Sequence, residues 1–180
     1  MKYKALTIIA LVTASVTLSA QENEAAEKIR YSNITEAGFM TTSHIGVAFE
    51  ATTVQGFSFD KQHHLGFGVG IGMSSHFSYH AAYMPLFVNY RYYFNPKKNF
   101  SPHVNASLGG LIKQEGAGIY SAFTAGFRHG KFSFSSGLSF MAVEDGYGYY
   151  WRQGSQFPIQ VSYPNWTFPF GITMKLGFAF

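Results

Sequence analysis

The final segment of the chain, residues 166–180, alternates strictly between two kinds of side chain. Its odd-numbered positions are small or polar, and they include a single charge at Lys175. Its even-numbered positions are all large and apolar: Trp166, Phe168, Phe170, Ile172, Met174, Leu176, Phe178 and Phe180. A period of two residues indicates a β-strand, because successive side chains of a strand point to opposite faces. The chain therefore contains a long strand with one large apolar face, which would be poorly solvated in water.

The same alternation recurs upstream and is interrupted by turn residues. Its clearest example spans residues 65–74, where glycine or serine occupies every second position and large apolar residues occupy the others. Strands are predicted at about residues 31–40, 45–52, 65–74, 84–94, 101–113, 118–128, 131–143 and 166–180. The chain thus belongs to the all-β class with about eight strands, and the pattern leaves open whether the count is eight or ten.

The N-terminal residues predict export from the cytoplasm. Lys2 and Lys4 precede an apolar run over residues 5–12, and the small residues Ser19 and Ala20 follow it. This order is typical of a signal peptide, so residues 1–20 are interpreted as one, with a retained membrane anchor as the alternative. Residues 21–30 are highly charged and do not alternate. We interpret them as a periplasmic leader and residues 31–180 as the barrel domain.

The composition suits a membrane rather than water. Charged residues make up 12% of the chain and aromatic residues 18%, whereas soluble domains average about 25% charged residues. Removal of the signal peptide takes away two lysines, so the formal charge falls from +4 to +2 and indicates no nucleic-acid partner. The chain has no cysteine, which excludes disulfides and thiolate metal sites. No motif predicts a metal ion or a cofactor.

A sheet in a membrane must close on itself, because an open edge would leave backbone N–H and C=O groups unpaired in lipid. The interior of an eight-stranded barrel is only just wide enough for side chains to fill. Small residues are therefore expected to face inward and large ones outward to lipid. Two long connections, residues 75–83 and 144–165, are interpreted as extracellular loops. The prediction is a transmembrane antiparallel up-and-down β-barrel in the cell outer membrane.

Four segments resemble the small outer-membrane β-barrel or porin-family proteins of Gram-negative bacteria, the OmpA-like and OmpX-like barrels. These segments are residues 35–39, 65–70, 85–94 and 176–180, and the resemblance covers roughly residues 34–180. It implies a barrel surrounded by outer-membrane lipid and inserted by the barrel-assembly machinery, which reads an aromatic-terminated last strand. Phe178 and Phe180 are then the candidate assembly signal. The resemblance implies no particular activity.

Charged residues fall on the inward faces of four predicted strands: Glu50, Arg91, Arg128 and Lys175. A charge facing lipid at the bilayer midplane costs about 2–4 kcal/mol, so these groups are expected to meet inside the barrel. We interpret them as an ion-pair and hydrogen-bond network that fills the lumen. The alternative is a selective path for small solutes.

The connection over residues 144–165 is rich in aromatic residues. Together with the start of the last strand it supplies Tyr147, Tyr149, Tyr150, Trp151, Tyr163 and Trp166. Such rings suit the girdle of a barrel, where the ring lies among lipid headgroups and its polar end stays wet. Acidic, basic and amide side chains at positions 144, 145, 152 and 153 suggest an alternative, a binding platform for an extracellular glycan or protein.

Three functions of different classes remain. The first is a non-enzymatic outer-membrane barrel with a structural or surface-interaction role carried by loops 75–83 and 144–165. The second is a narrow passive channel for small solutes. The third is a lipid-modifying enzyme, because His76, Phe77 and Ser78 resemble the His-x-Ser of lipid A deacylases. No carboxylate is placed to complete a triad, and therefore the first function is favoured.

Overall fold

The computed structural model describes residues 29–42, 46–76, 79–113, 116–145, 148–150, 159–161 and 165–180. Seven long strands come first: β1 (Ile29–Thr42), β2 (Gly46–Phe59), β3 (His63–His76), β4 (Tyr79–Tyr93), β5 (Phe100–Lys113), β6 (Gly116–His129) and β7 (Phe132–Asp145). Two short strands, β8 (Gly148–Tyr150) and β9 (Ile159–Val161), then pair only with each other. The chain ends with β10 (Asn165–Thr167) and β11 (Phe170–Ala179).

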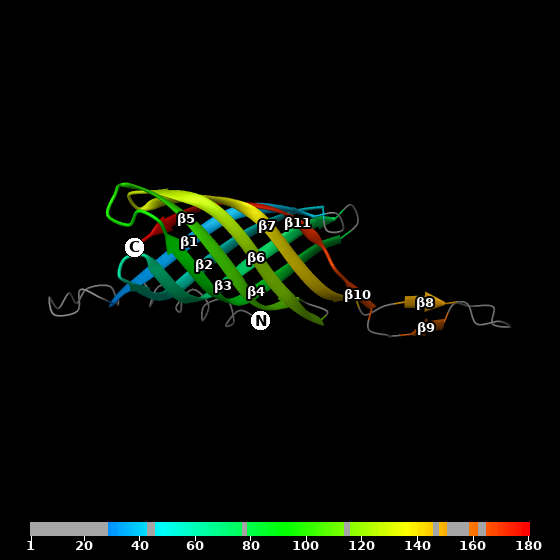
Figure 1. Ribbon diagram of the computed structural model, residues 1–180. Helices are drawn as coiled ribbons and strands as arrows, with labels where there is room; N and C mark the ends of the chain where they lie inside the picture. Colours follow the sequence, from blue (N-terminus) through cyan, green and yellow to red (C-terminus); the bar gives the residue numbers. More distant parts are fainter. Residues whose placement is uncertain are drawn as a thin grey trace, which may run out of the picture.

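The long strands form a closed antiparallel barrel. Each pairs with its neighbour in sequence, and β11 pairs with both β7 and β1. Figure 1 shows the tilted strands of the barrel, with β8 and β9 beyond the end at which β10 lies. We call this end the loop end, and the end where β1 begins and β11 finishes the terminal end. The predicted up-and-down barrel of eight strands is confirmed.

The eighth strand of the barrel consists of β10 and β11 together. Both pair with β7, and the residue pairing continues from one to the other without a shift. Phe168 and Pro169 interrupt the strand, because proline has no N–H to donate to the ladder. The Pro169 carbonyl still accepts a hydrogen bond from the Met141 N–H at 3.0 Å. The predicted strand over residues 166–180 is therefore correct in its faces and interrupted once.

The prediction of a long loop over residues 75–83 is wrong. β3 extends to His76 and β4 begins at Tyr79, and these two residues are cross-strand partners, as are Ser75 and His80. The segment lacks apolar alternation, yet backbone hydrogen bonds hold the ladder and do not require apolar side chains. Three of the four connections at the loop end are consequently short, and only the one between β7 and β10 is long.

The first strand starts slightly earlier than the sequence pattern indicates. Ile29 and Arg30, placed at the end of the charged leader over residues 21–30, pair with Phe59 and Ser58 of β2. The predicted signal peptide, residues 1–20, lies outside the described residues. Within the part of the chain that the structure describes, no helix is long and apolar enough to cross a membrane.

The outer wall of the barrel is apolar. Large side chains point outward from every long strand, and several are about two-thirds exposed, including Ile71 (67%), Phe132 (67%) and Leu176 (68%). Among the strand residues whose side chains the structure describes, no aspartate, glutamate, lysine or arginine faces outward. An apolar surface of this extent requires lipid, because soluble monomers do not expose one.

The inner wall carries several large side chains, whereas the sequence pattern indicated mainly small ones. Tyr83 and Phe87 of β4 are buried in the lumen and lie against the glycine face of β3. A Cβ atom added to Gly68 would collide with the Phe87 ring, and one added to Gly72 would collide with the Tyr83 ring. The alternating glycines of β3 therefore make room for the aromatic rings of its neighbour.

Candidate functional site

The lumen contains a buried polar cluster centred on Glu50, which points inward from β2 and is 6% exposed. Lys175 of β11 donates to its Oε1 atom at 2.5 Å, and the Tyr120 hydroxyl of β6 donates to the same atom at 3.0 Å. The Tyr83 hydroxyl of β4 donates to Oε2 at 3.3 Å. The three donors come from three strands on different sides of the barrel, so the cluster ties the walls together across the lumen.

A glycine allows Lys175 to reach Glu50. Gly38 of β1 lies between the two residues, since it pairs with Lys175 on one side and with Glu50 on the other. A Cβ atom at Gly38 would meet Cγ of Lys175 at 2.9 Å and would also collide with the β11 backbone. The lysine side chain can therefore pass over β1, where its Nζ atom also lies 3.2 Å from the Tyr120 hydroxyl.

A second buried ion pair joins Glu36 of β1 to Arg91 of β4. Arg91 Nη2 donates to Glu36 Oε1 at 2.6 Å, and the side chains are 0% and 4% exposed for Arg91 and Glu36. Gly177 faces Glu36 across the β1–β11 ladder, where a Cβ atom would lie 3.0 Å from Glu36 Cγ. Two unpaired charges would be very costly in this interior, and pairing offsets their desolvation.

Neutral polar side chains continue the network across β4, β5 and β6. The Asn89 amide donates to Asn105 Oδ1 at 2.5 Å and to Ser107 Oγ at 2.9 Å, and the Asn105 amide donates to Thr124 Oγ1 at 3.3 Å. Closer to the loop end, a buried apolar cluster fills the lumen with Met40, Ala48, Tyr83, Leu111, Tyr120, Met141 and Val143. Tyr83 and Tyr120 belong to both groups, because their rings pack in the apolar cluster while their hydroxyls bind Glu50.

The four charges predicted to meet in the lumen are placed differently. The structure brings Glu50 and Lys175 together, and it gives Arg91 another partner. Arg128 lies apart at the terminal end, where it is half-buried. Its guanidinium lies 4.5 Å from the centre of the Tyr93 ring and donates to the Pro96 carbonyl at 3.4 Å.

Glu36 was missed as a lumen charge, although it belongs to one of the buried ion pairs. Around it the sequence does not alternate, because the outward neighbours Asn33 and Thr35 are as polar as the inward ones. The face on which Glu36 lies could not be assigned from periodicity. The cost of exposing a carboxylate to lipid is the signal that could have placed it inside.

The aromatic residues of the long connection are described only in part. Tyr149 and Tyr150 lie in β8 and pair with Gln160 and Ile159 of β9. Trp166 faces outward from β10 and is 45% exposed, and its place in an interfacial girdle stays a prediction. Three further residues of the predicted aromatic girdle lie outside the described residues: Tyr147, Trp151 and Tyr163.

The C-terminal aromatic residues form a cluster at the terminal end. The rings of Phe178 and Phe180 meet edge to face with centroids 4.8 Å apart, and Phe132 of β7 approaches Phe178 at 5.1 Å. The Phe180 N–H donates to the Asn33 carbonyl of β1 at 2.9 Å. The last residue is thus attached to the first strand of the barrel. The role of Phe178 and Phe180 as an assembly signal stays a prediction.

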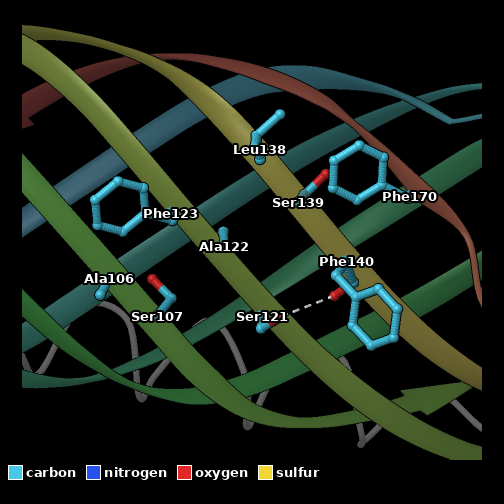
Figure 2. Close-up of a pocket in the computed structure, with 9 residues that line it drawn as sticks. All are labelled: Ala106, Ser107, Ser121, Ala122, Phe123, Leu138, Ser139, Phe140 and Phe170. Atoms are coloured by element: carbon cyan, nitrogen blue, oxygen red, sulfur yellow. Dashed lines mark hydrogen bonds between the residues drawn. The ribbon is translucent and has the colours of Figure 1, made fainter.

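A shallow hollow of about 300 Å³ lies in the outer wall over β5, β6 and β7. Figure 2 shows Phe123, Leu138, Phe140 and Phe170 spread around Ala122, with Ala106, Ser107 and Ser121 along the lower side of the hollow. The Ser121 hydroxyl donates to the Phe140 carbonyl at 3.3 Å, so it needs no further partner. The hollow is an irregularity in the apolar wall that an acyl chain can fill.

The described residues contain no cluster of metal-ligating side chains. None of their histidine, aspartate and glutamate side chains form a group of three or more that could hold a metal ion. Of the segment that resembles a deacylase motif, His76 lies at the end of β3, whereas Phe77 and Ser78 fall outside the described residues.

A closed eight-stranded antiparallel barrel with an apolar outer wall and a polar lumen is the architecture of outer-membrane β-barrels. The chain is a transmembrane barrel of this class, and the outer membrane is its location. No protein-family model matches the sequence, and no curated protein matches it.

Two solved structures are similar to this barrel. One is the N-terminal β-barrel domain of Pseudomonas aeruginosa OprF, at 12% sequence identity and a TM-score of 0.49, over 83% of this chain and 97% of that domain. The other is Neisserial surface protein A (NspA), at 10% identity and a TM-score of 0.47, over 84% of this chain and 97% of NspA.

Proposed function

We propose that this protein is a non-enzymatic barrel with a closed lumen that presents an interaction surface at its loop end. The observation that carries the proposal is the Glu50 cluster. Its four side chains come from β2, β4, β6 and β11 and meet inside the barrel. A passive channel needs a continuous aqueous path, and the buried ion pairs and apolar side chains inside this barrel argue against one. A closed lumen leaves the surfaces of the barrel as the places where it can act.

The long connection between β7 and β10 is the surface assigned to this role. It contains the β8–β9 ribbon, which lies beyond the loop end in Figure 1. Loops that carry binding residues on a rigid scaffold are a common arrangement. The proposed ligand is an extracellular glycan or glycoprotein, because aromatic rings and amide groups recur along this segment. Residues 75–83, also predicted to be an interaction loop, instead belong largely to the paired strands β3 and β4 and do not offer a comparable surface.

Two measurements test the proposal. In planar bilayers, the purified full chain is expected to give no conductance steps, because the lumen is blocked. Cells that display the full chain are expected to adhere to a panel of immobilised glycans and glycoproteins, and a variant with residues 147–163 replaced by a short Gly-Ser linker is expected to lose this adhesion. Heat-modifiable gel migration of both proteins serves as the control for barrel folding. Steady conductance, or equal adhesion by the two proteins, would contradict the proposal.

We further propose that the barrel-assembly machinery recognises the C-terminal aromatic residues. Deletion of Phe180 is expected to lower the amount of heat-modifiable barrel in cells several-fold. Refolding of the same variant from urea into lipid vesicles is expected to stay close to that of the full chain, because Phe180 contributes one ladder hydrogen bond at the end of the barrel. An equal loss in both experiments would mean that Phe180 acts only through stability.

A further inference from the structure

The outer wall of β1 and β2 differs from the rest of the barrel. Three successive cross-strand pairs face outward there and contain no large apolar side chain: Asn33 with Gln55, Thr35 with Thr53, and Ala37 with Ala51. Their outward direction follows from the register, because the residues between them include Ile34 and Glu36, which are buried in the lumen. Asn33 is only 5% exposed, and it is assigned to this face because its Oδ1 atom accepts the hydrogen bond of the outward Thr53 hydroxyl. We call these six residues the β1–β2 patch.

Apolar side chains surround the β1–β2 patch on all sides. Phe39 and Phe49 follow it toward the loop end, and Phe57 precedes it toward the terminal end. On the flanking strands, Val69 of β3 and Phe178 of β11 lie in the same rows. The patch therefore lies within the lipid-facing band rather than at its edge. Polar side chains in this environment lack water as a partner.

The polar groups of the patch satisfy one another only in part. The Thr35 hydroxyl donates to Thr53 Oγ1 at 3.4 Å, and the Thr53 hydroxyl donates to Asn33 Oδ1 at 3.0 Å. The Tyr31 hydroxyl donates to Gln55 Oε1 at 3.0 Å. Among the described residues, no acceptor is found for the amide N–H groups of Gln55. Such donors in lipid call for a partner that carries acceptors at the same depth.

We propose that a second copy of this chain covers the β1–β2 patch, forming a twofold-symmetric dimer within the membrane. Two barrels with the same orientation can be related by a twofold axis along the membrane normal, which brings the same residues of both copies to the same depth. A carboxamide carries both donors and an acceptor, so Gln55 is complementary to itself across such an axis. A lipid acyl chain offers no acceptor.

The shape of the patch supports the same occupant. Ala37 and Ala51 are exposed and small, and together with the threonines they form a low area between the Phe39–Phe49 pair and Phe57. Small residues let neighbouring backbones approach closely in membranes, where packing and hydrogen bonds rather than the hydrophobic effect drive association. Two copies of this face can therefore meet closely while their phenylalanines surround the contact.

The absence of cysteine makes a direct test possible. Ala51→Cys and Ala37→Cys place single thiols in the patch, and Ala106→Cys places one on the outer wall of β5 as a matched control. The purified full-length variants are reconstituted into phospholipid vesicles at a low protein-to-lipid ratio and then oxidised. A disulfide-linked dimer is expected for at least one of the two patch variants and not for Ala106→Cys.

A second variant links the dimer to the polar groups. Thr35→Val with Gln55→Met, added to the cross-linking patch variant, is expected to lower the dimer yield by about tenfold. The barrel should remain folded in heat-modifiable migration, because both replacements are apolar and face lipid. The proposal is overturned by equal cross-linking at Ala106, by monomers at all positions, or by an adduct formed in cells with another membrane protein but absent from vesicles.

Discussion

Replacement of Glu50 by glutamine is expected to lower the free energy of unfolding of the barrel by about 3–5 kcal/mol, the typical cost of removing one partner from a buried ion pair. Lys175 would remain within the lumen without a carboxylate, while the hydroxyls of Tyr83 and Tyr120 would lose their charged acceptor. Urea titration of the protein in lipid vesicles, followed by tryptophan fluorescence, measures the change.

Two further variants separate the ion pair from general effects of mutation. Arg128→Gln also removes an inward-facing charge, but Arg128 is only half-buried and lies outside both ion pairs, so a loss below about 1 kcal/mol is expected. Adding Lys175→Met to Glu50→Gln should recover much of the loss, because no buried charge is then left unpaired. Equal losses for Glu50→Gln and Arg128→Gln would show that the cluster does not hold the barrel together.

Gly68→Leu is expected to destabilise the barrel by about 3 kcal/mol or more, or to prevent it from closing. The inward face of β3 at this position is covered by the Phe87 ring, which even a single added carbon would overlap. The ring cannot move far, because it packs on Tyr120 with centroids 5.3 Å apart. The fraction of folded protein on unheated gels and the urea midpoint in vesicles both report the loss.

A compensating change and an exterior glycine provide the controls. Phe87→Ala in the Gly68→Leu background vacates the space that the leucine needs, so most of the stability should return. Gly110→Leu changes an outward-facing glycine, where a Cβ atom would meet nothing closer than the Gly118 carbonyl at 3.8 Å. Little loss is expected there, because the added side chain faces lipid. A similar loss at both glycines would contradict the complementarity between β3 and β4.

The fold could be predicted from the sequence wherever one face of a strand is apolar and the other is not. β11 and residues 65–74 of β3 meet this condition, and their inward and outward faces were assigned correctly. The pattern failed at both ends of the apolar band. It missed the β3–β4 hairpin at His76 and Tyr79, because ladder hydrogen bonds continue there without apolar side chains.

The arrangement inside the lumen could be predicted only in outline. Periodicity showed that Glu50, Arg91 and Lys175 face inward, but the partner of each depends on how far the strands are staggered around the barrel. That stagger places Arg91 against Glu36 rather than against Glu50. The large residues of the lumen were also not expected, since each depends on a glycine in the neighbouring strand, as Phe87 does on Gly68.

The seam between β1 and β11 has a consequence for the rate of unfolding. It joins Ile34 to Ala179, near the two ends of the barrel's chain, and such non-local pairings form late and slowly in folding. The contact between Glu50 and Lys175 spans this seam over 125 positions, so it can form only once the barrel has closed. Interactions absent from the transition state slow unfolding without speeding folding. We therefore expect the Glu50–Lys175 pair to lower the unfolding rate of the barrel, because it holds the paired edges of β1 and β11 together.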